Sequence, residues 1–132
     1  GKTACRAGLR DPFLRGKSFF GVTPVLNEAV STSGNYERNT VIDGVRYGHI
    51  VDPRTGRPTT GRISVTAIAP TGIESDALST TIFLCGPEIV PELTKEFPTL
   101  RVLIVQERDG ILETLRFGPG WEGVPDAKKP AP

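Results

Sequence analysis

The sequence predicts a single α+β domain with a mostly antiparallel sheet and two consecutive helices. The length of 132 residues suits one domain with its own core. Asp-Gly pairs at 43–44 and 109–110 separate runs of alternating apolar residues, which is a strong short-range signal of a β-hairpin. The segments with helix signals, 75–86 and 87–97, follow each other directly. Hairpins around a helical pair are typical of an α+β architecture.

Strands are expected in the first part of the chain. Residues 22–34 begin with β-branched and apolar residues and end in small hydroxyl residues and glycine, which predicts a strand that runs into a loop. The end of this segment is therefore a candidate ligand loop. Residues 39–50 should form a hairpin that turns at Asp43 and Gly44. The single histidine of the chain, His49, then stands at the far end of the second strand.

Further along, a turn, a strand and a closing hairpin are expected. The segment 52–56, Asp-Pro-Arg-Thr-Gly, must leave the strand direction because Pro53 fixes φ near about −65°. Residues 62–70 are rich in β-branched residues and predict a strand. The runs on either side of 108–110 predict the last hairpin.

Two helices are expected between that strand and the last hairpin. The first, over 75–86, ends at Gly86 with a proline just beyond, in agreement with the usual stop signals. The second, over 87–97, is weaker because it contains Pro91. We place Glu74 and Asp76 at the start of the first helix, where carboxylates interact favourably with the helix dipole.

Helical periodicity separates the side chains of the first helix into two groups. An apolar side is predicted to hold Leu78, Ile82 and Cys85. Asp76 and Thr80, spaced i and i+4, share roughly the opposite side. They could belong to a solvated face. Alternatively, a carboxylate and a hydroxyl oxygen on one face could hold Mg²⁺, with water or phosphate oxygens as the other ligands.

Composition excludes several classes of protein. The chain has 16 Lys and Arg against 15 Asp and Glu, so it has no excess of positive charge for a nucleic-acid partner. Its apolar runs are far shorter than the roughly 20 residues of a transmembrane helix, so no transmembrane segment is expected. Cys5 and Cys85 are not part of a CxxC pair. The sequence does not decide whether they form a disulfide, and we expect free thiols. We expect one domain over 1–122 and a disordered tail over 123–132.

Two segments hold candidate functional residues besides Asp76 and Thr80. His49 could be a half-buried strand histidine that bonds a neighbouring carbonyl, or a catalytic group held by the rigid turn that follows it. Residues 31–38 could be an ordinary connector, or their hydroxyl and amide groups could donate to phosphate or flavin oxygens. No P-loop, GxGxxG or HExxH motif occurs, which disfavours several common enzyme classes.

Four segments, taken in order, resemble one known family. They are AVSTSGNYER (29–38), DGVRYGHIVDPRTGRP (43–58), SVTAIAP (64–70) and SDALSTTIFLCG (75–86). Their order and spacing are similar to the C-terminal part of the FAD:protein FMN transferases, the ApbE-type family once linked to thiamine biosynthesis. The resemblance extends from about Leu9 to Arg116. It implies the C-terminal portion of the ApbE-like fold, and it implies that the N-terminal portion of the same enzyme is needed as a partner.

The resemblance implies a Mg²⁺-dependent transfer of FMN from FAD to a threonine or serine hydroxyl of a target protein, with release of AMP. The expected cofactors are FAD, as substrate, and Mg²⁺. The target would be a protein of a membrane redox complex. The expected location is the bacterial periplasm or another extracytoplasmic face, with a lipid anchor on the full-length protein. The alternative is a flavin-binding or interaction module of the same fold without transferase activity.

The family's functional residues map onto the motifs of this chain. Asp76 and Thr80 correspond to the metal ligands, and His49 to the active-site histidine. Relatives often have alanine where this chain has Ser75, next to the metal aspartate. The resemblance and the residues around these positions give the remaining cofactor-binding candidates, which are Thr32, Ser33, Gly34, Ile50 and Arg54. For Arg54, a structural role within the turn is an equal alternative to a phosphate contact.

Overall fold

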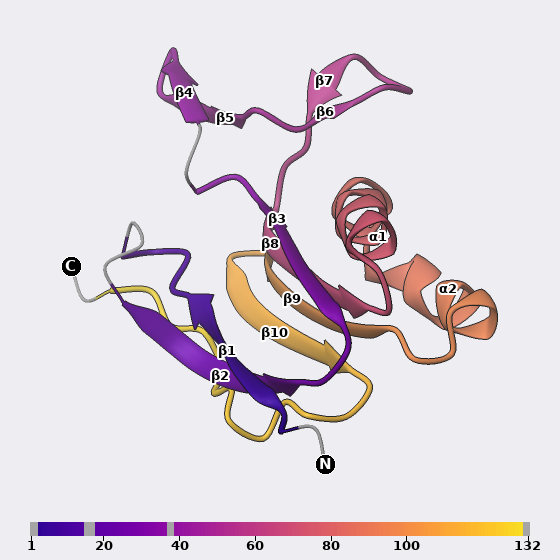
Figure 1. The fold of residues 1–132 in the computed structure, drawn as a ribbon. Coiled ribbons are helices and arrows are strands. Elements are labelled where there is room, and N and C mark those ends of the chain that lie inside the picture. The colour runs from indigo at the N-terminus through magenta and orange to yellow at the C-terminus, as the bar shows by residue number, and fades with distance from the viewer. Residues whose placement is uncertain (1–2, 15–17, 37–38, 131–132) are drawn as a thin grey trace.

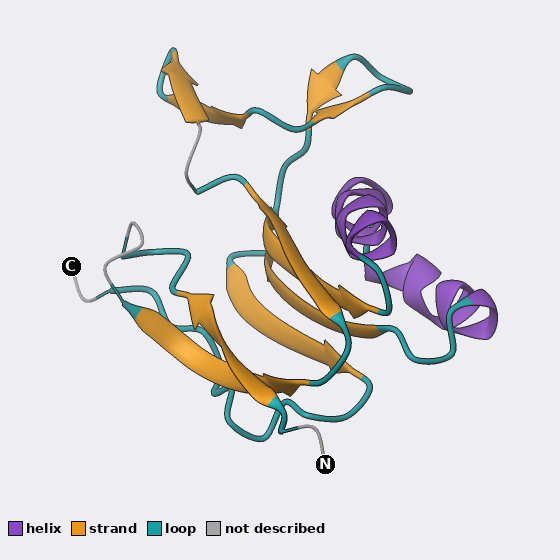
Figure 2. Cartoon of the chain, in the orientation of Figure 1, coloured by secondary structure: helices purple, strands orange, loops and turns teal. Residues whose placement is uncertain are grey.

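The computed structural model describes residues 3–14, 18–36 and 39–130, and it confirms an α+β fold with a mostly antiparallel sheet (Figures 1 and 2). The central sheet has four strands in the order β10-β9-β8-β3, and every neighbouring pair is antiparallel. Its strands are β3 (Ala29–Gly34), β8 (Arg62–Ala69), β9 (Arg101–Arg108) and β10 (Ile111–Phe117). The helical segments are α1 (Gly72–Cys85), the short 3₁₀ helix η1 (Pro87–Ile89) and α2 (Val90–Glu96).

The central sheet is covered on both faces. Figure 1 shows α1 and α2 on one side of the sheet, and the hairpin of β1 (Cys5–Arg10) and β2 (Phe19–Val25) on the other. Side chains of a strand alternate between its two faces. The helix-facing core contains Val65, Ala67, Ala69, Leu78, Ile82, Phe83, Val90, Leu100, Val102 and Ile104. The hairpin-facing core contains Leu9, Ile68, Leu103, Trp121 and Val124.

The segment 22–34 differs from the prediction of one strand that runs into a loop. The structure has two strands, β2 and β3, with a break at Leu26–Glu28 where Asn27 has a φ of 52°. The predicted ligand loop therefore lies in a strand. In β3, Thr32 pairs with Thr66 and Ser33 with Val65 of β8. Small hydroxyl residues suit this strand because the neighbouring helix supplies hydrogen-bond partners for their side chains.

Helix α1 begins three residues earlier than predicted, at Gly72. The N-cap is Thr71, whose hydroxyl accepts a hydrogen bond from the Glu74 backbone, while the Glu74 carboxylate accepts one from the Thr71 backbone. This reciprocal capping box satisfies two amides of the helix start. Asp76 consequently lies beyond the first turn, so the prediction that it is the dipole partner is wrong. The same prediction for Glu74 is confirmed, because Glu74 is the acidic residue of the first turn.

The buried face of α1 is also more polar than predicted. It consists of Ser75, Leu78, Ser79, Ile82 and Phe83. Cys85, predicted on the apolar side, is exposed, and the same is true of Cys5; both are free thiols, as expected. The carbonyls of Phe83 and Leu84 accept hydrogen bonds from the Arg62 guanidinium, so β8 supplies a cation to the negative end of the helix.

The other predicted elements are present with small changes. The segment 87–97 is divided into η1 and α2. The closing hairpin of β9 and β10 turns at Asp109 and Gly110, which both have positive φ. The hairpin of β4 (Asn39–Ile42) and β5 (Val45–Gly48) turns at Asp43 and Gly44, with φ values of 51° and 78°. A positive φ at both positions is the requirement of a type I′ turn.

Two small hairpins extend away from the central sheet. In Figure 1, β4–β5 and the hairpin of β6 (Val51–Asp52) and β7 (Arg57–Pro58) lie beyond the ends of β3 and β8. Residues 49–50 connect them. The segment between β3 and β8 thus leaves the sheet, forms two hairpins and returns.

The described part of the C-terminal tail, up to residue 130, has no helix or strand after β10. We predicted disorder from Gly123 onward, but the described part of this segment has specific contacts. Val124 is buried, the Ala127 amide donates to the Thr114 hydroxyl, and Lys129 forms an ion pair with Glu107. Among the described residues, no helix is long and apolar enough to cross a membrane.

Candidate functional site

A cavity of about 440 Å³ lies where the end of β3, helix α1 and the link between the two small hairpins meet. Its lining consists of Thr32, Ser33, Gly34, Tyr36, His49, Ile50, Asp76 and Thr80. Every residue predicted for the site is therefore present except Arg54. The roles predicted for these residues stay predictions, but their juxtaposition is a property of the fold.

Strand β3 presents its hydroxyl groups in two directions. The Ser33 side chain is buried and lies within hydrogen-bond distance of Ser79 and Thr80 on α1, at 2.9 and 3.1 Å. The Thr32 hydroxyl lies 2.8 Å from the Thr66 hydroxyl on β8. Gly34 ends the strand at the edge of the cavity. One face of β3 is thus attached to the helix, and the end of the strand borders the cavity.

Helix α1 supplies a carboxylate and a hydroxyl to the same cavity. Asp76 is exposed and Thr80 is partly buried. Because Thr80 contacts Ser33 of β3, it lies at the border of the buried face and not on the side opposite to it. Since Glu74 caps the helix, Asp76 has no role at the helix start. Asp76 is therefore not a dipole partner, whereas its exposure agrees with the solvated face of the alternative interpretation.

The donor set of Asp76 and Thr80 fits a hard cation such as Mg²⁺. Proteins often bind Mg²⁺ through one or two carboxylates, and water and phosphate oxygens complete the octahedron. Within the described ranges, no three His, Cys, Asp or Glu side chains form a metal-binding cluster. Asp76 and Thr80 can therefore supply two oxygen ligands, and the others must come from water, a phosphate or another segment.

His49 and Ile50 lie in the link between β5 and β6. Ile50 is partly buried and packs against the helix-facing core, which attaches this link to the body of the molecule. The preceding residue, Gly48, is so close to the Asn35 side chain that a Cβ would collide with it. His49 itself is exposed and follows the strand, so the description of a half-buried strand histidine does not apply. Its imidazole is accessible to a substrate in the cavity.

Arg54 is the predicted residue that the structure does not bring to the cavity. Its guanidinium binds the Asp52 carboxylate, with Nη2 2.6 Å from Oδ2, and its backbone amide donates to Oδ1 at 2.9 Å. Gly56 closes the turn with a hydrogen bond from its amide to the Asp52 carbonyl at 2.8 Å. The Arg54 side chain lowers the pKa of Asp52 to about 2. This geometry favours the structural alternative, in which Arg54 stabilises the turn.

Tyr36 lines the cavity, but the sequence analysis did not single it out. It follows directly after the small residues at the end of β3, and an aromatic ring in such a place could have been noticed. Tyr36 also lines a second cavity of about 570 Å³. The two cavities therefore share one aromatic residue.

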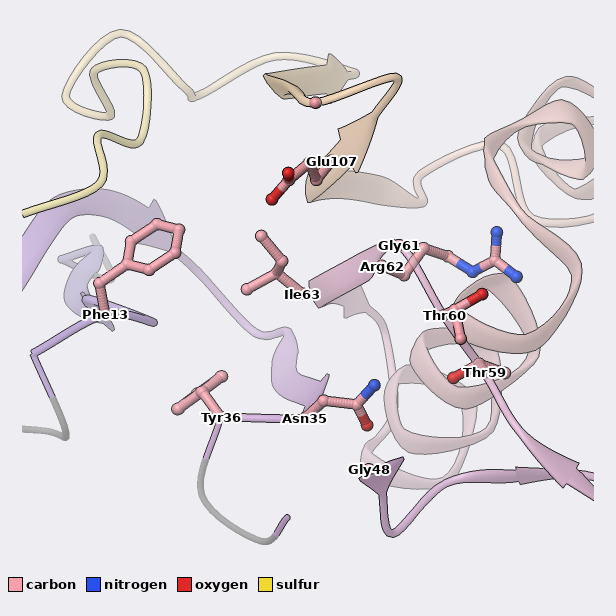
Figure 3. Close-up of a pocket in the computed structure, with 11 residues that line it drawn as sticks. Phe13, Asn35, Tyr36, Gly48, Thr59, Thr60, Gly61, Arg62, Ile63 and Glu107 are labelled. Carbon is pink, nitrogen blue, oxygen red and sulfur yellow. The ribbon is translucent and has the colours of Figure 1, made fainter. Parts of the chain in front are cut away.

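The second cavity is lined by residues from distant parts of the chain. Figure 3 shows Phe13, Asn35, Gly48, Glu107 and the segment 59–63 around it. The hydroxyl oxygen of Thr59 is buried there without a hydrogen-bond partner among the described residues. Sequence reasoning did not find this cavity, because its lining comes from segments that are far apart along the chain.

Comparison with known proteins agrees with this geometry. The family model described as ApbE family matches residues 1–104. A FAD:protein FMN transferase of Treponema pallidum is 43% identical over 74% of this chain, and one of Rhodobacter capsulatus is 36% identical over 100% of it. The crystal structure of the ApbE protein of Thermotoga maritima superposes with a TM-score of 0.68, at 41% identity over 86% of this chain.

This chain is shorter than these proteins. It spans 27% of the Treponema protein, 25% of the Rhodobacter protein and 36% of the Thermotoga chain. The match nevertheless includes the strand, helix and link that line the cavity, because it extends over residues 1–104. The chain therefore belongs to the ApbE family.

Proposed function

We propose that this chain forms part of a Mg²⁺-dependent FAD:protein FMN transferase, which transfers FMN from FAD to a threonine or serine hydroxyl of a target protein. The observation that carries the proposal is the cavity that gathers an imidazole, a carboxylate and several hydroxyls from β3, α1 and the hairpin link. The names of the relatives support the reaction, and the accessible His49 supports its chemistry.

The proposed reaction is a phosphoryl substitution at FAD. The target hydroxyl oxygen attacks the phosphorus on the FMN side of the pyrophosphate, and the bond from that phosphorus to the bridging oxygen breaks. FMN becomes esterified to the target, AMP leaves with the bridging oxygen, and the hydroxyl proton goes to His49. A neutral imidazole can take this proton because it is a base near neutral pH.

The remaining lining residues hold the substrate. Asp76 and Thr80 would hold Mg²⁺, which supplies neutralisation of the charge that develops on the phosphate oxygens. The hydroxyl of Thr32 and the backbone at Gly34 border the cavity and can donate to the nucleotide. Ile50 offers an apolar surface beside His49 for the flavin. Water, the substrate and the remaining portion of the enzyme would supply the other metal ligands.

The proposal includes a contribution from the part of the enzyme that this chain does not span. The chain corresponds to about a quarter to a third of its relatives, so further FAD contacts and metal ligands belong to the remaining portion. Family resemblance alone supports the extracytoplasmic location, the lipid anchor and a target in a membrane redox complex. Because this chain spans only part of its relatives, the activity is proposed for the whole protein.

The experiment compares two carboxylate variants in the whole protein. Asp76→Asn should abolish Mg²⁺-dependent AMP release from FAD and covalent flavin transfer, because an amide is a much weaker ligand for Mg²⁺ than a carboxylate. Asp109→Asn, in the exposed β9–β10 turn, is the control and should leave both unchanged. The measurements are AMP by chromatography and flavin fluorescence on the acceptor protein after denaturation.

Two outcomes would overturn the proposal. Full activity of Asp76→Asn would remove Asp76 from the site. If the wild-type protein binds FAD but releases no AMP with Mg²⁺ and a threonine-bearing acceptor protein present, the alternative of a flavin-binding module without transferase activity would be correct.

A further inference from the structure

The contact between strand β3 and helix α1 is built from paired hydroxyl groups. Ser31 lies 2.8 Å from Ser75, and Ser33 lies 2.9 Å from Ser79, measured between the side-chain oxygens. Alternate residues of a strand are separated by about 6.6 Å, and residues i and i+4 of a helix by about 6 Å. The two spacings match closely, so β3 and α1 can form the same contact twice. Ser75 and Ser79 are both fully buried.

The direction of these hydrogen bonds follows from their partners on the helix. The Ser75 hydroxyl donates to the Gly72 carbonyl at 3.1 Å, and the Ser79 hydroxyl donates to the Asp76 carbonyl at 3.0 Å. A carbonyl can only accept, and a hydroxyl has a single proton. The single proton of each helix serine is therefore engaged with a helix carbonyl. Ser75 and Ser79 must accept the hydrogen bonds that they share with β3. Ser31 and Ser33 are the donors.

The second of these contacts continues to the proposed metal ligand. The Ser33 oxygen also lies 3.1 Å from the Thr80 oxygen. Because the Ser33 hydroxyl already donates its hydrogen bond to Ser79, Thr80 must be the donor in this contact. The Thr80 proton thus points to Ser33, toward the interior. The oxygen lone pairs of Thr80 are left for the cavity, where Asp76 also lies.

We propose that Ser33 and Ser79 are positioning residues that orient the Thr80 hydroxyl as a metal ligand. The inference rests on the Mg²⁺ site of the proposed function and adds two residues to it. A cation is bound through lone pairs and is repelled by a hydroxyl proton, so a group that holds this proton away from the site strengthens binding. Ser33 accepts a hydrogen bond from the Thr80 hydroxyl. Ser79 accepts the hydrogen bond that Ser33 donates, so Ser33 has no proton left to donate to Thr80.

The Ser31–Ser75 pair is an internal control for this inference. It has the same hydroxyl contact, the same bond to the carbonyl three residues earlier in the helix and the same elements. It differs in having no contact with Thr80 among the bonds described for these residues. A loss of packing or of β3–α1 attachment should therefore follow from changes in either pair, whereas a loss of metal binding should follow only from changes at Ser33 or Ser79.

The experiment measures binding of Mn²⁺ alone, as a paramagnetic probe for Mg²⁺, to the whole protein by electron paramagnetic resonance. Ser33→Ala and Ser79→Ala should raise the Kd for Mn²⁺ by roughly 10- to 100-fold, the range found when a partner of a metal ligand is removed. Ser31→Ala and Ser75→Ala should leave this Kd unchanged. Ser33→Cys has nearly the size of serine but is a weak acceptor, so it should behave as Ser33→Ala does. Melting curves verify that each variant is folded.

Three results would overturn the inference, and they differ in what they say about the site. If all four alanine variants weaken Mn²⁺ binding equally, the serines act through packing. Unchanged Mn²⁺ binding in Ser33→Ala and Ser79→Ala, together with weak binding in Asp76→Asn, would refute the positioning role while the metal site stands. Unchanged binding in Asp76→Asn would refute the metal site of the proposed function as well. Should Ser33→Ala fail to fold, Ser79→Ala still decides, because alanine suits a helix interior.

Discussion

His49 is placed by its neighbours along the chain and not by burial of its own ring. Ile50 packs against the helix-facing core, and Gly48 lies against Asn35, so the backbone on both sides of the imidazole is attached to the body of the protein. The ring itself is exposed at the cavity. An attached backbone and an accessible ring are what a general base needs, because it must meet a substrate proton in a defined geometry.

At this scale we predict that His49→Asn in the whole protein keeps FAD binding but slows flavin transfer by roughly 10²- to 10⁴-fold, the usual contribution of a positioned general base. Asparagine is polar and of similar size, yet it cannot accept the hydroxyl proton, so ground-state binding survives while the transition state is lost. Single-turnover flavin transfer at saturating FAD, beside an FAD titration and a melting curve, provides the measurement. An unchanged rate in a stable, FAD-saturated variant would show that His49 is not the base.

At the scale of elements, helix α1 holds both the metal candidates and the capping box. The box of Thr71 and Glu74 fixes where the helix begins, and the Arg62 guanidinium binds carbonyls at its other end. Both ends are therefore satisfied by groups outside the Asp76 and Thr80 face. This leaves Asp76 without a structural task in the helix, so its substitution should affect the site more than the fold.

The capping box itself makes a testable contribution. We expect Thr71→Ala to lower the free energy of unfolding by about 1 kcal/mol, because the Glu74 amide loses its hydrogen-bond acceptor at the helix start. Thr81→Ala, an exposed threonine in the same helix, is the matched control and should be neutral or slightly stabilising, since alanine has the higher helix propensity. Urea denaturation followed by circular dichroism measures both. Equal effects of the two substitutions would contradict the role of the cap.

At the scale of the whole molecule, the packed layers and the two small hairpins are separate regions. The sheet is buried between the helices and the β1–β2 hairpin. The β4–β5 hairpin lies beyond this core and exposes Val41 and Ile42, which are 59% and 56% accessible. An isolated two-stranded hairpin is only marginally stable in water. The cavity thus lies between the sheet-and-helix body and the link of His49 and Ile50, which is attached to the core through Ile50 and leads from the weakly supported β4–β5 hairpin.

This arrangement predicts a wide range of local stability in the 132-residue chain. Amides of β4 and β5 should exchange with solvent orders of magnitude faster than amides of β8 and β9, because the hairpin opens without disturbing the core. Native-state hydrogen exchange read by NMR compares the two sets within one sample, so β8 and β9 are the internal reference. Equal protection of the two sets would show that the hairpin unfolds only with the whole domain.

Much of the fold and part of the site could be predicted because their signals are local. The turns at Asp43–Gly44 and Asp109–Gly110 depend on which residues tolerate a positive φ, and the end of α1 depends on Gly86. The candidates His49, Asp76 and Thr80 also came from local patterns and from the family resemblance. The turns and the helix end need only the sequence within one element, and the resemblance needs only the order of four segments, so the sequence by itself determined them.

Tertiary structure decided which groups meet across the sheet and the helix. Ser33 reads as a loop residue, yet it is buried in a strand because Ser79, 46 residues further along the chain, receives its hydrogen bond. Arg54 turns back to Asp52, and Tyr36 enters the cavity. The orientation of Thr80 likewise depends on Ser33. The contact between the Ser33 and Ser79 hydroxyls forms only when two distant segments are packed together, and for this reason no local pattern could reveal it.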